Sequence, residues 1–482
     1  MHKLYINGKL VEGKGKPMDV INPATGKVVA TIHTASIDQA EEALQAAKRA
    51  FKTWSFTSIN ERVQWLCKLK NACLKYKDEL IHEMMIEVGK SRQEAEGDFG
   101  GFMMNFDFFA EEIKRVYGTV VPQCDVKRGT TMQYVYRRPL GVTVSHMAWN
   151  AVGFNLGTKL CPNIVSGCCG VFKPSSATPL FALKVGEICA EIELPAGIVN
   201  ILIGSASEIG KYLNESEIPA MISLIGSVET GKEIVRQGAT SVKHYSMELG
   251  GNAPCIFMPD ADLDKALPWL VARKIGSAGQ GCANVNRIYV HESIHDTFVE
   301  QLVEAVRKVP NGWGEDMPAL TSGPLIDVRT RDAKIALVQR AVKEGAKLLY
   351  GGTVPEELPE DRRNGAYMVP AVLDGVTDDM EIARTELFAP IFQVLTFGDD
   401  LDDLIDRCNR SDYGLASMLF THDSRTIFKL VEELEHAEIN VNLAGAGPNI
   451  PHVGMKASGT GCVRSVWSLE EYLQLCCASV NP

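Results

Sequence analysis

Short apolar runs alternate with helical patterns between Leu140 and Gly250. The intervening stretches, such as PLFALKVGEICAEI, repeat apolar residues at helical spacing, which is typical of helices packed on one face. Each apolar run is short and is closed by Gly, Pro or Ser, as strands commonly are. The runs are GVTVSH, CCGVFKPS, GIVNILIG, MISLIGS and HYSMELGG. This alternation predicts a parallel sheet with helices on both faces, in which ligands bind at the carboxyl ends of the strands.

A second alternation of the same kind begins near Asn252 and continues to about Asn442. It contains APCIFMPDADL, RIYVHES, the helical pattern DTFVEQLVEAVRKV, KLLYGGT and IFQVLTF. We therefore expect an α/β fold with two doubly wound, Rossmann-like domains built on parallel sheets. The first domain comprises residues 1–117 and 140–249, and the second comprises residues 250–445.

Two strand-like segments have no helix to cover them. Asp125–Pro139 alternates like a two-stranded hairpin, and the tail EYLQLCCASV is strand-like as well. Isolated strands of this kind commonly pair across a subunit boundary. We therefore expect residues 118–139 and 463–482 to form a β-hairpin arm and tail that build a homodimer or homotetramer.

Composition and charge exclude several classes of protein. The 482 residues are 45% hydrophobic and 23% charged, which is typical of a globular protein of about two or three domains. A formal charge of -11 argues against a nucleic-acid surface. No apolar stretch approaches the ~18 residues of a membrane span, and the N-terminus lacks the apolar core of a signal peptide. The 13 scattered cysteines suggest reduced thiols and a cytoplasmic location.

Two motifs imitate well-known sites. Gly226–Glu233 reads GSVETGKE, but a phosphate-binding loop needs Ser or Thr where Glu233 stands. His291–His295 reads HESIH, but it directly follows a predicted strand, so its first residues lie in a turn and not on one helical face. We expect no metal site.

Three polar residues suggest covalent chemistry on a carbonyl group. Cys282 lies among glycines just before a predicted strand, Glu248 ends an apolar run, and Asn150 follows Trp149 at another strand end. Taken singly, they suit a small buried cysteine, a strand-end salt bridge and a helix N-cap. Together they supply a thiolate nucleophile, a carboxylate that activates water and an amide that holds an oxyanion.

The chain resembles the aldehyde dehydrogenase superfamily over essentially its whole length. The order and spacing of several motifs carry this resemblance. They are AWN at 148–150, FKPS at 172–175, IGSVETG at 225–231, MELGG at 247–251, GQGCANVNR at 279–287, ELFAP at 386–390 and GMKASG at 454–459.

The resemblance implies a role for each matching residue. Cys282 would attack an aldehyde to give a thiohemiacetal, with the oxyanion held by Asn150 and the Cys282 N–H. Hydride transfer to a nicotinamide would leave a thioester, which Glu248 would hydrolyse through water. The first domain would bind the dinucleotide, and the second would carry the nucleophile. The implied cofactor-binding residues are Trp149, Lys173, Ser175, Ser176, Gly204, Gly226, Ser227, Leu249, Glu386 and Phe388.

Departures from the family pattern bear on cofactor and substrate. Ser176 stands where Glu often favours NAD, so both NAD and NADP are open. The C-terminal stretch around His452 is similar to lactaldehyde and glycolaldehyde dehydrogenases, although Thr158 or Lys159 stands where that branch tends to have Arg. The segment around Cys282 looks closer to succinate-semialdehyde dehydrogenases. The expected substrate is a short polar aldehyde, either a hydroxyaldehyde or a semialdehyde. The residues expected to meet it are Phe154, Thr158, Gly281 and His452.

Two alternatives are an acylating enzyme that uses coenzyme A and a catalytically silent binding protein on the same scaffold. Glu248 argues against the first, because such enzymes lack the water-activating carboxylate. Cys282, present in its full motif, argues against the second.

Overall fold

A computed structural model describes residues 2–123, 132–314, 317–318, 320–445 and 447–481. All of the apolar runs in the first alternation form strands of one sheet, in the order β11-β10-β7-β8-β9-β1-β2. The first five pair in parallel, while β1 and β2 add an antiparallel edge. The strands are β1 (Leu4–Ile6), β2 (Lys9–Val11), β7 (Val142–His146), β8 (Cys169–Lys173), β9 (Val199–Ile201), β10 (Met221–Ile225) and β11 (His244–Glu248).

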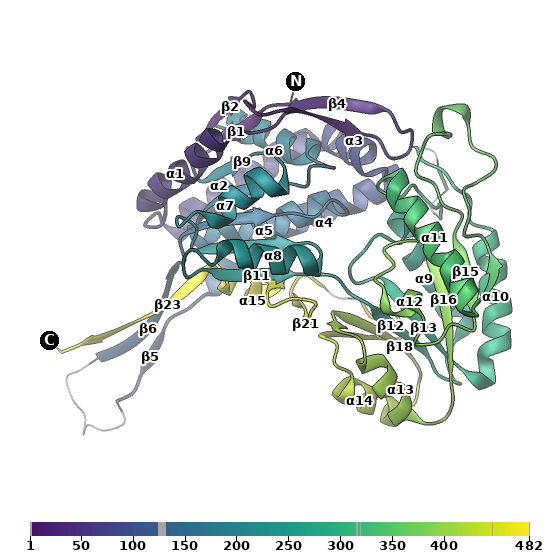
Figure 1. The fold of residues 1–482 in the computed structure, drawn as a ribbon. Coiled ribbons are helices and arrows are strands. Elements are labelled where there is room, and N and C mark those ends of the chain that lie inside the picture. Colours follow the sequence, from purple (N-terminus) through teal and green to yellow (C-terminus); the bar gives the residue numbers. More distant parts are fainter. Residues whose placement is uncertain (1, 124–131, 315–316, 319, 446, 482) are drawn as a thin grey trace.

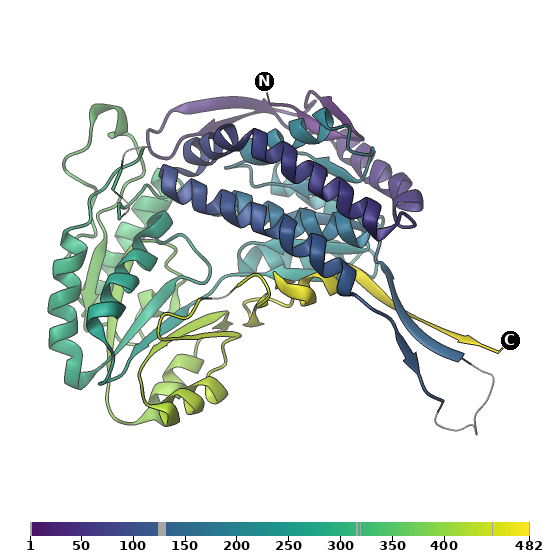
Figure 2. The same ribbon diagram turned by 180° about the vertical axis from the view of Figure 1, so that it is seen from behind.

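Helices cover both faces of this first sheet, which explains why β7, β8 and β10 are buried along their whole length. Figure 2 shows the long N-terminal helices, in purple to blue, in front of the sheet. Ser36 and Ser91 begin α1 and α4 with capping boxes. The helices are α1 (Ile37–Trp54), α2 (Ile59–Lys75), α3 (Lys77–Val88), α4 (Arg92–Glu112), α5 (Val152–Ser166), α6 (Leu180–Glu191), α7 (Lys211–Glu215) and α8 (Val228–Gly238).

The second alternation forms a separate sheet in the order β14-β15-β16-β13-β12-β18-β19, parallel except for β14. Successive residues of β13 face opposite sides: Tyr289 packs into one apolar cluster, and Ile288 and Val290 pack into another. The strands are β12 (Ala253–Phe257), β13 (Val285–His291), β14 (Lys347–Tyr350), β15 (Ala371–Asp374), β16 (Ile391–Phe397), β18 (Ala416–Phe420) and β19 (Glu438–Val441). The helices are α9 (Leu263–Ile275), α10 (His295–Arg307), α11 (Val328–Glu344), α12 (Glu381–Arg384), α13 (Leu401–Asn409) and α14 (Ser424–Glu433). The predicted α/β fold with two Rossmann-like sheets is confirmed.

A three-stranded antiparallel arm projects from the body (Figure 1). It consists of β5 (Thr119–Val121), β6 (Met132–Pro139) and the tail strand β23 (Leu473–Val480). The hairpin expected within Asp125–Pro139 needs correction, because its first strand lies earlier, at β5; residues 125–131 lie outside the described residues. The tail forms the expected strand, which pairs with β6 of the same chain.

The C-terminal segment returns from the second sheet to the first. Gly459 bridges to Glu248, and the Leu249 N–H donates to the Ser458 carbonyl at 2.8 Å. This return brings residues after position 450 beside the end of β11. The short elements of the chain are the β3–β4 ribbon (Pro17–Ile21 and Val28–His33), β17 (Tyr413–Gly414) with β21 (Met455–Lys456), β20 (His452–Val453) with β22 (Cys462–Val463), and α15 (Ser465–Glu470).

The two histidines of the HESIH motif do not lie on one helix. His291 ends β13 and contacts Asp399, whereas His295 begins α10 and contacts Asp374 and Asp296. Lys232 is exposed on α8 and donates to Glu229 at 3.0 Å. Of the described helices, none is long and apolar enough to cross a membrane.

Candidate active site

A cavity of about 810 Å³ lies between the two sheets, at the carboxyl ends of β7, β10 and β11 of the first sheet and beside the amino ends of β13, β16 and β19 of the second. Asn150, Glu248 and Cys282 all line it, although they are far apart in the sequence. Asn150 follows β7, Glu248 ends β11, and Cys282 precedes β13. The topology of the fold therefore brings the three predicted chemical groups to one cavity.

Cys282 lies in a tight loop between α9 and β13. Gly279 has a φ of 75°, and a Cβ there would meet the Ala389 carbonyl oxygen at 2.4 Å. A Cβ on Gly251 would meet the Cys282 carbonyl oxygen at 2.5 Å. These glycines let the neighbouring backbones approach the loop that carries Cys282. Burial, and next the charge of Glu248, raise the pKa of the Cys282 thiol to about 11, while the hydrogen bond to His452 opposes this rise.

Asn150 is held against the loop that carries Cys282. Its Nδ2 donates to the Gln280 carbonyl at 3.1 Å, and its Oδ1 accepts from Asn155 at 3.3 Å. It does not act as the N-cap of α5, because that position is Ala151 and has no side-chain cap bond. The amide keeps a second N–H that can serve an oxyanion.

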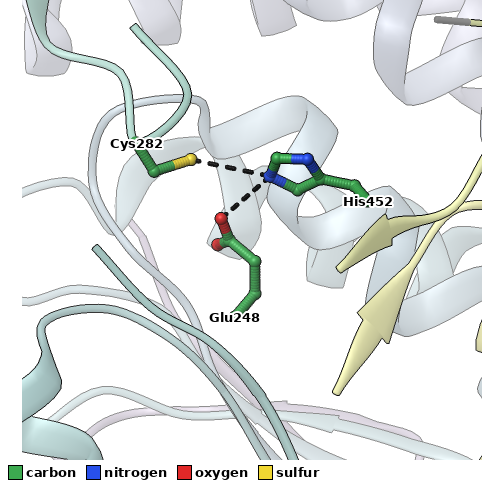
Figure 3. Close-up of side chains that lie close together, drawn as sticks. All are labelled: Glu248, Cys282 and His452. Atoms are coloured by element: carbon green, nitrogen blue, oxygen red, sulfur yellow. Dashed lines mark hydrogen bonds and ion pairs between the residues drawn. The ribbon is translucent and has the colours of Figure 1, made fainter. Parts of the chain in front are cut away.

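The His452 ring lies between Glu248 and Cys282 (Figure 3). Its Nε2 lies 2.9 Å from Glu248 Oε1 and 3.8 Å from Cys282 Sγ. Its Nδ1 bonds to Glu438 Oε1, which also accepts from Arg464 Nη2 at 2.7 Å. Burial alone would lower the pKa of His452, but its bonds to Cys282, Glu248 and Glu438 raise that pKa well above its usual value.

Sequence reasoning missed Glu438 and Arg464. Glu438 begins β19, the half-buried edge strand of the second sheet, and a charged residue at its start is a weak sequence signal. Arg464 has a φ of 65°, a left-handed conformation that its residue type does not reveal. Burial alone would raise the pKa of the Glu438 carboxyl, but the hydrogen bond from His452 and the charge of Arg464 lower this pKa below its usual value.

Several of the predicted cofactor residues line the other part of the cavity, namely Trp149, Gly226, Ser227, Glu386 and Phe388. Phe388, at a φ of 47°, packs edge-on against Trp149 with 5.4 Å between ring centroids. Glu386 accepts from the Gly251 N–H at 2.9 Å, and burial raises the pKa of its carboxyl to about 7. A Cβ on Gly250 would lie 2.6 Å from Glu386 Oε2, so a larger residue there would force this carboxylate to shift.

The residues at the carboxyl ends of β8, β9 and β10 fit a dinucleotide. Gly226 leads from β10 into α8, whose N-terminus is capped by Ser227 and can receive a phosphate. Lys173 is buried, and among the described residues its ammonium has no hydrogen-bond acceptor. Burial lowers the pKa of this lysine to about 8. An orphaned buried cation suits a ribose hydroxyl or a phosphate.

The remaining predicted cofactor residues lie outside the lining of this cavity. The Ser176 hydroxyl donates to the Gly204 carbonyl at 3.2 Å, and Ser175 Oγ accepts from the Ala177 N–H. A Cβ on Gly204 would meet Ile209 at 2.4 Å. Leu249 is buried beside α8.

Three of the predicted substrate residues line the cavity, namely Phe154, Gly281 and His452. Thr158 does not: it is fully buried in α5, and its hydroxyl donates to the Asn155 carbonyl at 3.0 Å. The cavity wall also contains polar residues that the sequence analysis did not select, namely Lys90, Arg273, Asn284 and Asn440.

Comparisons with known proteins agree with this geometry. The aldehyde dehydrogenase family matches residues 10–476. A succinate-semialdehyde dehydrogenase [NADP(+)] of Escherichia coli is 34% identical over 98% of this chain and 96% of its own length. A lactaldehyde dehydrogenase of the same species is 34% identical, over 98% and 97%. The crystal structure of a Staphylococcus aureus betaine aldehyde dehydrogenase in complex with NAD+ superposes with a TM-score of 0.94 at 29% identity, covering 100% of this chain and 94% of that one.

The fold, the cavity and these matches define an NAD(P)-dependent oxidoreductase that acts on aldehydes. The chain belongs to the aldehyde dehydrogenase family.

Proposed function

We propose that this enzyme oxidises a short polar aldehyde to its carboxylic acid through a thioester on Cys282. The observation that carries this proposal is that Cys282, Glu248 and Asn150 line one cavity, with the thiol and the acid joined by His452. Nucleophile, base and oxyanion donor are the parts that acyl transfer requires.

Cys282, Asn150 and Glu248 each have a defined task in the proposed reaction. The Cys282 thiolate forms a C–S bond with the aldehyde carbon, and Asn150 Nδ2 with the Cys282 N–H holds the resulting oxyanion. When bound, the nicotinamide accepts the hydride, which supplies the two-electron oxidation. Glu248 then takes a proton from water, whose oxygen attacks the thioester, and the acid leaves as the C–S bond breaks.

The proposed substrate is a hydroxyaldehyde such as lactaldehyde or glycolaldehyde, or a semialdehyde such as succinate semialdehyde. The named relatives act on substrates of both kinds. The polar wall of the cavity, with Arg273, Asn284 and Asn440, suits a polar group at the far end of the aldehyde. His452 cannot be assigned to that polar group alone, because it already bonds two carboxylates.

Both NAD and NADP suit the proposed site. Lys173 offers a positive charge to a 2′-phosphate, and the neutral Ser176 neither repels that phosphate nor demands a free hydroxyl. We propose that Lys173, Ser175, Ser176 and Gly204 hold the adenosine part, while Glu386, Phe388 and Trp149 hold the nicotinamide part. Gly226, Ser227 and Leu249 complete the proposed site.

We also propose a cytoplasmic homodimer or homotetramer. The arm exposes apolar side chains, among them Val120, Met132 and Leu475, which a second copy of the chain would cover. The cysteines of the described residues are free thiols, as a reducing compartment would leave them. We expect the chemistry to need no metal.

The proposal is tested by mixing the protein with a panel of hydroxy-, carboxy- and sulfo-aldehydes and following reduced cofactor with NAD and with NADP. Cys282→Ala should abolish turnover while the cofactor still binds. Activity that requires coenzyme A would support the acylating alternative. If the protein oxidises no aldehyde on the panel, this result would support the alternative of a catalytically silent binding protein. Full activity in Cys282→Ala would remove the nucleophile from the mechanism.

A further inference from the structure

His452 is a shared hydrogen-bond donor between the acid and the sulfur. A carboxylate oxygen only accepts, and Nδ1 faces Glu438 while Nε2 faces Glu248. Both ring nitrogens therefore carry a proton, and the imidazole is a cation. The Nε2–H lies within reach of both Glu248 Oε1, at 2.9 Å, and Cys282 Sγ, at 3.8 Å (Figure 3).

The far side of the ring is fixed in place. Glu438 holds Nδ1 and is itself held by Arg464 at 2.7 Å. His452 and Glu438 both lie at the heads of short strands, β20 and β19. The ring cannot turn away from the thiol without breaking the bond to Glu438, so its cationic edge stays aimed at the nucleophile.

The charges of this buried cluster cancel while the thiol is neutral: His452 and Arg464 are positive, and Glu248 and Glu438 are negative. Losing the thiol proton to solvent would leave one uncompensated negative charge, and burial makes such a charge costly. Moving that proton from Sγ to Glu248 exchanges one anion for another and leaves the sum at zero. The internal transfer is therefore the favoured route to a thiolate.

We propose that His452 is a catalytic residue, whose imidazolium transfers its Nε2–H hydrogen bond from Glu248 to the Cys282 thiolate as the thiol proton moves to Glu248. The proposal rests on the function proposed above. In this step the S–H bond breaks, an O–H bond forms on Glu248, and the electron pair stays on sulfur. The thiolate then attacks the aldehyde. Glu248 releases its proton to solvent through the cavity before it acts as the base for water.

Other ionisable groups around the cluster contribute to its electrostatics. Arg273 of α9 acts on Cys282 and Glu438, Lys159 of α5 acts on Glu248, and Cys462 of β22 faces His452. Arg273 and Lys159 are not bonded to the thiol in the hydrogen-bond network of the described residues. His452 is therefore the cation whose removal should change thiolate formation most.

The test measures thiolate formation directly, without aldehyde or cofactor. The full-length protein is treated with iodoacetamide from pH 5 to 10, and alkylation of the Cys282 peptide is followed by mass spectrometry. Removing a cation beside the sulfur raises the pH at which the thiolate forms. In His452→Gln, the alkylation profile should move to higher pH and the rate at pH 7 should fall by about ten-fold or more. Glu438→Gln should also move the alkylation profile to higher pH, but by a smaller amount.

His295→Gln is the matched control, because His295 also sits between two carboxylates, Asp296 and Asp374, but lies outside the cavity lining. Its profile should match the wild type. A His452→Gln profile that also matches the wild type, with only a raised KM for the aldehyde, would overturn the proposal and leave His452 as a substrate contact. If His452→Gln does not fold, an unchanged profile in the milder Glu438→Gln overturns it. Wild-type turnover that is lost in Cys282→Ala would keep the proposed function intact in either case.

Discussion

At the scale of single residues, the site combines buried charges that each need a partner. Glu248 is 2% exposed and Lys173 is 7% exposed. Glu248 has its partner in His452, whereas Lys173 has none among the described residues. A buried charge without a partner is costly, so we propose different tasks for the two residues: proton transfer for Glu248 and ligand binding for Lys173.

Glu248→Gln should separate thioester formation from thioester hydrolysis. Glutamine keeps the size of the side chain but cannot take a proton from water. We expect a burst of about one reduced cofactor per site followed by a stall, because the thioester persists. Rapid-mixing absorbance measures the burst, and mass spectrometry of the stalled protein should find the acyl group on Cys282. Steady turnover at the wild-type rate would remove Glu248 from the hydrolytic step.

Ser176→Glu should shift the cofactor preference toward NAD. A carboxylate at this position would repel a 2′-phosphate and accept from free ribose hydroxyls. We expect the ratio of kcat/KM for NAD to that for NADP to rise by about ten-fold or more, equivalent to roughly 1.4 kcal/mol. Ser176→Ala is the matched control, since it removes the hydroxyl without adding charge. The same ratio in all three proteins would show that Ser176 does not read the ribose.

Sequence reasoning selected Cys282, Glu248 and Asn150 because together they supply complementary chemical groups and each stands in a motif that resembles one family. It could not find Glu438 and Arg464, because their roles come from contacts with His452 across the fold and not from their own neighbours in the chain. For Thr158, the sequence predicted a substrate contact that the structure does not show. Its position after Asn150 suggested the pocket, but the turn of α5 directs its hydroxyl to a backbone carbonyl.

At the scale of elements, the loop before β13 depends on left-handed backbone. Ser277, Ala278 and Gly279 all have positive φ in succession. Strain of this kind persists only where the surroundings enforce it, and it commonly occurs at functional sites. The loop therefore sets the position of Cys282. In the sequence, β12 and α9 separate this loop from β11, the strand that carries Glu248.

Gly279→Ala should damage the site more than the fold. The added Cβ would meet the Ala389 carbonyl oxygen at 2.4 Å, and the φ of 75° disfavours alanine. We expect a loss of stability of roughly 1–3 kcal/mol, measured by urea unfolding, and a drop in kcat of at least about ten-fold as the Cys282 loop shifts. Gly97→Ala is the control, because a Cβ there meets nothing within 4 Å inside helix α4. Equal kinetics for the two variants would contradict the role of the loop.

The parallel strands of the first sheet, and β12, β13, β14 and β16 of the second, could be read from the sequence, in most cases because a strand buried on both faces appears as an unbroken apolar run. The sequence analysis did not predict β15, β18 and β19 individually. The arm could be read only in part. β5 has three residues, all exposed, so it lacks the buried positions that reveal a strand. The alternation of strands and helices does not predict β1 and β2. These two strands pair antiparallel through a short turn, with no helix between them.

At the scale of the whole molecule, the arm projects from the body with exposed apolar side chains (Figure 1). Leu475 is 62% exposed on β23. Leu475→Glu should therefore leave the fold intact and shift the assembly toward the monomer, since only a partner would bury this side chain. Sedimentation velocity measures the shift. Val242→Glu, on a fully exposed residue away from the arm, is the control and should sediment as the wild type does. An oligomer that is unchanged by Leu475→Glu would exclude the arm from the interface.

The return of the C-terminal segment to β11 has a consequence for the synthesis of this protein. A ribosome completes Cys282 long before it reaches Glu438 and His452, so the growing polypeptide carries a thiol without its charged neighbours. Until the final stretch emerges and docks, that sulfur is an ordinary cysteine. Nascent chains released early should therefore lack the complete cluster, which forms only with the last tenth of translation.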